Sequence, residues 1–242
     1  SYETQAMQKM MESAGYEIVP FGEEIADIYI INTCSVTNIA DRKSRQMIHK
    51  AKKLNPEAVV AAAGCYVESA GDNIDEDVDI VIGNNEKSHL IEILNEYFEH
   101  MDKEKSVDIG KVTDFDELNI DSPLEHTRAY VKIQDGCNRF CSYCIIPYVR
   151  GRIRSRKPDD VMAEIKRVAA SGCKEVVLTG IHLSSYGLDF KDNTVKLIDV
   201  IEAVNRIEGI ERIRLGSLEP LIVTEEFVRR LAKCKKICPH FH

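Results

Sequence analysis

The chain has 242 residues, a formal net charge of −8 and eight cysteines. This length allows two hydrophobic cores, and the acidic balance argues against a basic surface that binds nucleic acid everywhere. Neither a secretory signal nor an apolar run of membrane-spanning length is recognisable in these residues. We therefore expect a cytoplasmic protein, away from membranes, whose cysteines are ligands or buried thiols and form no disulfides.

The first hundred residues alternate between predicted helices and strands. Apolar side chains recur at helical spacing in residues 2–14, and further helices are expected at 38–54 and 86–98. Short apolar runs predict buried strands at 28–31, 58–62 and 78–82. This order is typical of an open α/β domain with a parallel sheet, which we assign to residues 1–100.

Two cysteines follow strands of this predicted sheet. Cys34 comes after the strand at 28–31, and Cys65 comes after the strand at 58–62. Because ligands of parallel sheets gather at the carboxyl ends of the strands, both thiols are expected at the same edge. The alternative is two ordinary buried thiols, since free cysteine packs as a small hydrophobic residue.

Residues 101–126 are rich in acidic side chains, and we predict a linker there. The second domain, residues 127–242, repeats strand and helix. Strands are expected at 128–134, 175–179, 210–215 and 237–242, with helices at 159–171, at 195–207 and after Thr224. Such units build a parallel (β/α) barrel, whose active site lies at the carboxyl ends of its strands.

Three cysteines lie in the loop after the first of these strands: Cys137, Cys141 and Cys144. Their Cys-x3-Cys-x2-Cys spacing brings three thiolates together, and such groups typically bind iron–sulfur cofactors. A four-iron cluster takes four ligands, so three thiolates leave one iron open for chemistry. Zinc is the alternative, but it usually needs a second cysteine or histidine pair, and no histidine is near in the sequence.

This cysteine spacing, with Tyr143 before the last cysteine, resembles the signature of radical S-adenosylmethionine enzymes. Other segments resemble the amino-terminal domain of the methylthiotransferases: Tyr2-Glu-Thr-Gln-Ala-Met, Ile31-Asn-Thr-Cys-Ser-Val-Thr and Gly64-Cys-Tyr. The resemblance implies S-adenosylmethionine and two 4Fe-4S clusters as cofactors. One cluster would bind the three cysteines of the loop, and the auxiliary cluster would bind Cys34, Cys65 and a cysteine that the family carries upstream of Tyr2.

The family also has a first strand before that position and a partial barrel of six units, of which four are expected here. We therefore expect a fragment of a longer enzyme, with the first domain lacking its first strand, the barrel incomplete, and no certainty of activity on its own. The implied reaction is radical insertion of a methylthio group at carbon 2 of an adenine in tRNA. It needs no side chain as general acid or base, so we name no catalytic residue.

The segment Gly180-Ile-His-Leu-Ser-Ser-Tyr-Gly looks like the branch of the family that acts on threonylcarbamoyladenosine 37, next to the tRNA anticodon. The branches for isopentenyladenosine and for a ribosomal-protein aspartate are alternatives. From other classes, an iron–sulfur electron carrier and a zinc-stabilised RNA-binding module also remain open. The implied partners are a tRNA anticodon stem-loop and an electron donor such as flavodoxin.

Several positions match contacts that the family makes with S-adenosylmethionine: Tyr143, Gly180, Ser217, Glu219 and His242. Gly180 could instead simply end a strand, because glycine is common in turns. We expect His182 and His240 to be packing residues, since a single strand histidine is more often a hydrogen-bonded packing residue than a contact.

One basic run, Arg150-Gly-Arg-Ile-Arg-Ser-Arg-Lys157, follows the cysteine loop. Guanidinium groups suit phosphates, and Tyr143 and Tyr148 offer faces on which a base could stack. We therefore predict that RNA is bound by Arg150, Arg152, Arg154 and Arg156. The alternative is that these arginines pair with carboxylates of this acid-rich chain. We expect structural roles for Cys173, Cys234 and Cys238.

Overall fold

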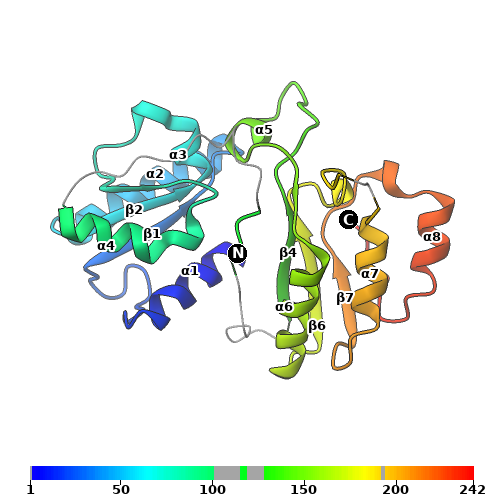
Figure 1. Cartoon of the computed structure of the whole chain (residues 1–242). Coiled ribbons are helices and arrows are strands. Elements are labelled where there is room, and N and C mark those ends of the chain that lie inside the picture. Colours follow the sequence, from blue (N-terminus) through cyan, green and yellow to red (C-terminus); the bar gives the residue numbers. More distant parts are fainter. Residues whose placement is uncertain (1, 101–114, 119–127, 192–193) are drawn as a thin grey trace.

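The computed structural model describes residues 2–100, 115–118, 128–191 and 194–242. Two α/β units, each with its own sheet, lie side by side (Figure 1). Most of the expected linker at 101–126 lies outside the described residues. Within the described segment 115–118, Leu118 is buried against Tyr2 and Ala6 of the first helix.

The first sheet is parallel throughout and has the strand order β1-β2-β3. Its strands are β1 (Ile28–Thr33), β2 (Val59–Gly64) and β3 (Ile80–Ile82). Strand β2 is buried on both faces because its side chains alternate between two layers. Val60 and Ala62 pack in one layer, whereas Ala61 and Ala63 pack in the other. The predicted open α/β domain is thus confirmed.

Two pairs of helices cover this sheet. One layer contains residues of α2 (Asn38–Leu54) and α3 (Cys65–Ala70), and the other contains residues of α1 (Tyr2–Ser13) and α4 (Leu90–His100). Thr37 caps α2 by accepting a hydrogen bond from the Ala40 N–H, at 3.1 Å. Short 3-10 turns are η1 (Gly71–Asn73) and η2 (Lys87–His89), and η2 leads directly into α4.

The second sheet has the strand order β5-β4-β6-β7. Three strands are parallel, as expected: β4 (Ala129–Asp135), β6 (Glu175–Gly180) and β7 (Arg212–Leu215). A further strand, β5 (Arg154–Ser155), was not predicted; it is short and antiparallel and pairs with the end of β4. The basic run therefore contributes an edge strand to the sheet rather than an open loop.

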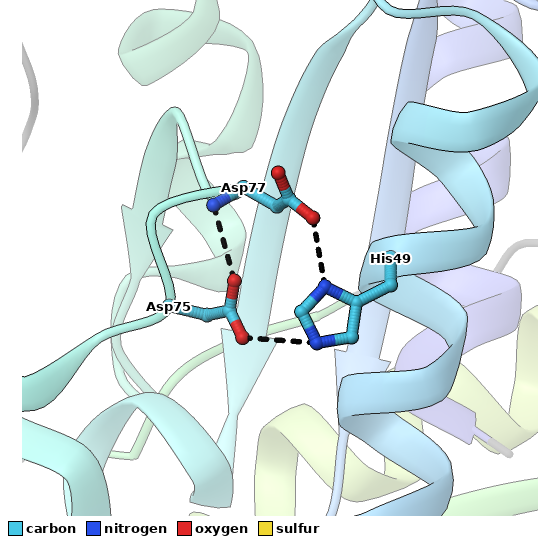
Figure 2. A group of neighbouring side chains, drawn as sticks. All are labelled: His49, Asp75 and Asp77. Carbon is cyan, nitrogen blue, oxygen red and sulfur yellow. Dashed lines mark hydrogen bonds and ion pairs between the residues drawn. The ribbon is translucent and has the colours of Figure 1, made fainter.

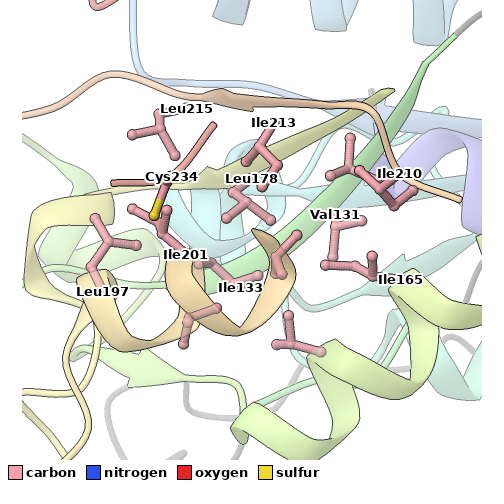
Figure 3. Packing of buried hydrophobic residues seen from close by; sticks show 14 of the residues in the cluster. Val131, Ile133, Ile165, Leu178, Leu197, Ile201, Ile210, Ile213, Leu215 and Cys234 are labelled. Atoms are coloured by element: carbon pink, nitrogen blue, oxygen red, sulfur yellow. The ribbon is translucent and has the colours of Figure 1, made fainter. Parts of the chain in front are cut away.

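Helices pack on this sheet around one apolar core, which includes Val131, Leu178 and Ile213 from the strands and Ile165 and Ile201 from the helices (Figure 3). The helices are α5 (Ile146–Val149), α6 (Pro158–Ala170), α7 (Leu197–Asn205) and α8 (Glu225–Leu231), with 3-10 turns η4 (Leu183–Ser185) and η5 (Pro220–Ile222). None of the helices in the described parts of the chain is long and apolar enough to cross a membrane.

The expected fourth strand at 237–242 does not form. Ile237 makes a single parallel bridge with Ile213, and the Cys238 N–H donates to the Ile213 carbonyl at 2.9 Å. Pro239 follows, and because proline has no N–H it cannot extend the ladder of hydrogen bonds. This segment therefore lies beside β7 without continuing as a strand.

Candidate metal centres at the domain junction

The cysteine loop is pinned where it leaves β4. The Cys137 N–H donates to the Gly151 carbonyl at 3.1 Å. Gly136 has a φ of +67°, and a Cβ there would lie 1.9 Å from the Arg152 carbonyl oxygen, so only glycine fits. Farther along, Phe140 has a φ of 47°, and the Cys144 N–H donates to the Cys141 carbonyl at 2.9 Å. The loop is thus held against the sheet edge at its start and wound into a turn at its end.

The three thiols of this loop differ in exposure: Cys137 is buried, Cys144 is partly exposed and Cys141 is exposed. The Arg139 backbone N–H donates to the Cys137 sulfur at 3.5 Å, a type of contact that tunes thiolate ligands of iron–sulfur clusters. Only one group of three donors among the described residues has ligand atoms within 4.8 Å of one another, and it contains no cysteine. Three soft thiolate donors on one loop suit an iron–sulfur cluster.

Cys34 and Cys65 leave the first sheet at the same edge, as the sequence predicted. Each directly follows one member of the paired residues Thr33 and Gly64. Gly64 has a φ of +104°, and a Cβ there would lie 2.6 Å from the Thr33 carbonyl oxygen. Ser35 joins the two segments, because its hydroxyl donates to the Cys65 carbonyl at 2.9 Å. Two thiols alone do not complete a four-iron cluster, so such a cluster would need further ligands here.

The two thiol-bearing edges meet where the domains touch. The side-chain amide of Asn84 lies 3.8 Å from the Cys65 sulfur and donates to the Val149 carbonyl at 2.6 Å. Arg154 adds a second bridge, since its guanidinium donates to the Asn85 side-chain oxygen at 3.0 Å. Helices α3 and α5 are in contact at this point. The sequence carried no signal for Asn84, because its neighbours come from distant parts of the chain.

A cluster of buried charges lies in the same junction, and we call it the junction cluster: Glu3, Lys87, Lys132, Asp135 and Arg150. Glu3 binds Lys87 at 2.6 Å and Lys132 at 2.8 Å, and Asp135 binds Lys132 at 2.6 Å. Burial alone would raise the pKa of both carboxyl groups. The surrounding cations reverse this effect and hold the pKa of Glu3 and of Asp135 well below the usual value.

Three of the four arginines predicted to bind RNA are engaged inside the protein, which corrects that prediction. Arg150 binds Glu3 and Asp135, Arg154 donates to backbone carbonyls, and Arg156 pairs with Glu117 and Glu164. Their side chains are 12%, 1% and 1% exposed. Arg152 alone of the four is exposed, with its guanidinium 4.4 Å above the Phe140 ring. The alternative expectation, that these arginines pair with carboxylates of the chain, therefore holds for Arg150, Arg154 and Arg156.

The positions that match cofactor contacts gather after β6 and β7. Glu219 binds the Arg139 guanidinium and lies 3.2 Å from Nε2 of His182. Arg139 comes from the cysteine loop, so this pair joins the loop to the ends of these strands. The position of Arg139 between Cys137 and Cys141 was the sequence signal for its place at this site. The contact with Glu219 agrees with the expectation that His182 is a hydrogen-bonded packing residue.

Ser217 and His242 lie together, with 2.8 Å between the hydroxyl oxygen and Nδ1. Gly180 has a packing reason of its own, because a Cβ there would lie 2.8 Å from Oε1 of the buried Gln134. Tyr143 is 90% exposed. A cavity of about 410 Å³ adjoins this region, and its lining includes Arg139, Tyr186, Leu197, Glu219 and Phe227.

The one group of three close donors lies elsewhere, on the first domain, and we call it the His49 clamp: His49, Asp75 and Asp77. Nδ1 of His49 lies 2.7 Å from Asp77, and Nε2 lies 3.3 Å from Asp75 (Figure 2). The two carboxylates thus contact different nitrogens of the imidazole ring. This arrangement suits a protonated imidazole between two aspartates, because the donors do not converge on one metal position.

Comparisons with known proteins match both domains. Residues 1–83 match uncharacterized protein family UPF0004, and residues 131–242 match the radical SAM superfamily. Over its whole length the chain is 41% identical to the threonylcarbamoyladenosine tRNA methylthiotransferase MtaB of Bacillus subtilis (strain 168) and 42% identical to that of Aquifex aeolicus (strain VF5). It covers 54% and 58% of these proteins, so it spans about half the length of the curated relatives it matches.

A tRNA-2-methylthio-N(6)-dimethylallyladenosine synthase of Clostridium botulinum (strain Langeland / NCTC 10281 / Type F) is 34% identical over 99% of this chain and 54% of its own. Among solved structures, the radical S-adenosylmethionine methyltransferase TsrM from Kitasatospora setae has a TM-score of 0.66 over 98% of this chain and 55% of its own. Its sequence identity is 14%, so this likeness concerns the fold. The chain therefore consists of a segment like UPF0004 followed by a radical SAM domain, and over its whole length it is similar to about half of the tRNA methylthiotransferases named above.

Proposed function

We propose that this chain belongs to a cytoplasmic tRNA methylthiotransferase that inserts a methylthio group at carbon 2 of threonylcarbamoyladenosine 37, next to the anticodon. The observation that carries the proposal is the meeting of two thiol sites at one junction. Asn84 lies against the Cys65 sulfur and donates to the Val149 carbonyl, shortly after the cysteine loop. A reaction that needs one site to supply a group and another to activate the substrate requires such proximity.

In this proposal Cys137, Cys141 and Cys144 hold a 4Fe-4S cluster, and Cys34 and Cys65 contribute ligands to an auxiliary one. Bound together with S-adenosylmethionine, these groups would supply the one-electron chemistry that activates an unreactive carbon–hydrogen bond. The side chains and backbone of the protein would bind these groups and orient them. The pinned start of the loop fixes the buried thiol of Cys137, and the Arg139 N–H donates a hydrogen bond to that sulfur.

The proposed contacts with S-adenosylmethionine are Tyr143, Gly180, Ser217, Glu219 and His242. Glu219 supports this assignment best, because Arg139 and His182 orient its carboxylate beside the cysteine loop. A carboxylate held in this way can accept hydrogen bonds from the hydroxyl groups of a nucleoside. An electron donor such as flavodoxin would reduce the clusters.

The proposed RNA contact is the exposed surface beside the cysteine loop. The rings of Phe140 and Tyr148 pack edge to face, with 5.6 Å between their centroids, and the side chain of Arg152 lies over Phe140. Tyr148 is 66% exposed, so a ring face is available to an unpaired base. Exposed aromatic rings beside an arginine are a common means of holding single-stranded loops of RNA.

The test is anaerobic reconstitution with iron and sulfide, followed by reaction with a chemical reductant such as dithionite, S-adenosylmethionine and an anticodon stem-loop that contains threonylcarbamoyladenosine. We expect iron and sulfide to bind, the cofactor to be cleaved and the methylthio nucleoside to be detected by mass spectrometry. Replacing Cys137, Cys141 and Cys144 together with alanine should abolish cleavage. The matched control replaces Cys173, Cys234 and Cys238, which should leave cleavage intact.

Cleavage that survives in the first triple variant would contradict the proposal. A cluster bound by four protein thiolates would instead favour an electron carrier, and a colourless protein that retains zinc would favour an RNA-binding module. The similarity to tRNA-2-methylthio-N(6)-dimethylallyladenosine synthases supports a second candidate substrate, the tRNA nucleoside that carries a dimethylallyl (isopentenyl) group. The same assay with isopentenyladenosine in the stem-loop decides between the two, because only the true substrate gains the methylthio group.

A further inference from the structure

We infer that Tyr2 and Glu3, the first two residues of α1, are positioning residues that hold the two thiol-bearing edges in one fixed relation. The inference rests on the proposed function, because fixed separation matters only if the two sites act together. The two residues open the segment Tyr2-Glu-Thr-Gln-Ala-Met, and the site described above gives this segment no role.

Helix α1 belongs to the first domain but begins at the second. Farther along the helix, Met7 and Met11 pack in the core of the first domain with Ala61 and Ile80. The amino-terminal end of the helix points toward the second sheet (Figure 1). There the Tyr2 hydroxyl donates to the Leu118 carbonyl and lies 3.4 Å from both carboxylate oxygens of Glu164, in helix α6. One helix is thus anchored in one domain and held at its tip by the other.

Glu3 binds cations from both domains. It is 7% exposed, and its two oxygens bind Lys87 of the first domain and Lys132 and Arg150 of the second. A buried carboxylate needs such partners, because an unpaired charge in the interior is strongly unfavourable. Glu3 can therefore be satisfied only when the two domains lie in the observed arrangement.

From Glu3, short chains of contacts lead to a cysteine on each side. In the first domain, Lys87 donates to the side-chain oxygen of Asn84 at 3.0 Å, and the amide of Asn84 lies against the Cys65 sulfur. In the second domain, Lys132 binds Asp135, which accepts the Gly136 N–H at 2.7 Å, immediately before Cys137. Displacement of Glu3 would therefore change how the two thiol sites lie relative to each other, while each site keeps its own thiols.

The function of this network is orientation. Buried ion pairs contribute little net stability, since the cost of removing charges from water offsets their attraction, but they select one arrangement over its competitors. A hydrogen-bonded network with every member satisfied has the same effect, because a shifted domain would leave several groups unpaired at once. An apolar junction would allow the two domains to slide past each other, whereas this network of paired charges holds them in one position.

The test measures the distance between domains by single-molecule fluorescence energy transfer. Dyes are attached to azide-bearing residues at the exposed positions of Met47 and Lys166, which avoids the cysteines. We expect one narrow population for the unchanged chain and a broadened or second population for Glu3→Gln and, more weakly, for Tyr2→Phe. The matched control is Glu12→Gln, an exposed glutamate at the other end of the same helix whose contact is with Gln8.

A second readout separates positioning from folding. Glu3→Gln should lower the yield of methylthio nucleoside per cofactor cleaved by about 10- to 100-fold, because small displacements of reacting groups have effects of this size. Cofactor cleavage itself should change less than about twofold, since the three cysteines of the loop are unchanged in this variant. A folded Glu3→Gln variant in which both quantities fall together would overturn the inference for Glu3.

Tyr2→Phe keeps the test decisive if Glu3→Gln does not fold. The inference is overturned if the folded variants keep the narrow distance distribution of the unchanged chain. A wild-type chain that makes no methylthio nucleoside would instead count against the proposed function, while the distance measurement would still test the positioning of the domains.

Discussion

The junction cluster and the His49 clamp contain similar groups at similar distances, yet they differ in surroundings. In the junction cluster Glu3 lies 2.6 Å from Lys87, and in the clamp His49 lies 2.7 Å from Asp77. The Lys87 side chain is 0% exposed, whereas that of His49 is 56% exposed. Because water screens exposed charges, only the buried group can strongly restrict how domains sit. The distance within an ion pair therefore says little about its role.

The largest expected effect comes from breaking the junction cluster. Lys132→Met removes a buried cation from both Glu3 and Asp135. Loss of one member of a buried ion pair leaves uncompensated charge, so we expect the free energy of unfolding to fall by about 3–5 kcal/mol. Urea denaturation followed by circular dichroism measures this quantity.

The matched control for this variant is Lys174→Met. Lys174 and Glu211 form a pair at 3.7 Å with side chains 51% and 61% exposed. Such a pair contributes at most about 1 kcal/mol, so the control should stay close to the unchanged chain. Equal effects of the two substitutions would remove the distinction between buried and exposed pairs.

A smaller effect distinguishes two arginines of the same basic run. Arg156→Ala leaves the buried carboxylate of Glu164 without its cation, and we expect a loss of about 3 kcal/mol in the free energy of unfolding. Burial already raises the pKa of Glu164, which limits the loss because this carboxyl group can take up a proton.

Arg152→Ala should leave stability within about 0.5 kcal/mol, since this side chain is exposed. It should instead weaken binding of the anticodon stem-loop and reduce the salt dependence of that binding by about 0.7 in the logarithmic slope, the value for one phosphate of a single strand. Fluorescence anisotropy at several salt concentrations measures both. Unchanged RNA affinity in this variant would exclude Arg152 from the RNA contact.

The smallest effect concerns the His49 clamp. The hydrogen bond to Asp77 raises the pKa of His49 above its ordinary value. The resulting stabilisation is fully present below the unfolded pKa, about 6.5, and is lost as the pH rises through the higher folded pKa. His49→Gln should thus lower the free energy of unfolding by less than about 1 kcal/mol at pH 6. The difference should vanish by about pH 9, and a difference that grows with pH would contradict this assignment.

Much of the fold could be predicted because it depends on local patterns. The helix at 38–54 was predicted with its observed bounds, since a helical pattern depends on the residues of the segment itself. The convergence of Cys34 and Cys65 followed from parallel strands, whose carboxyl ends share an edge whatever the details of packing. The fourth strand was wrong because Pro239 interrupts pairing at a place where the apolar pattern continues.

The sequence by itself determined the order of helices and strands and the three thiols of the cysteine loop, because both follow from covalent spacing and periodicity over a few residues. The tertiary structure alone decided which charges are buried. Glu3 and Lys132 are 129 positions apart, and of the four arginines in one short basic run three pair inside the protein and one is exposed. The state of a charge depends on what folding brings around it, and those neighbours come from segments that no local pattern connects.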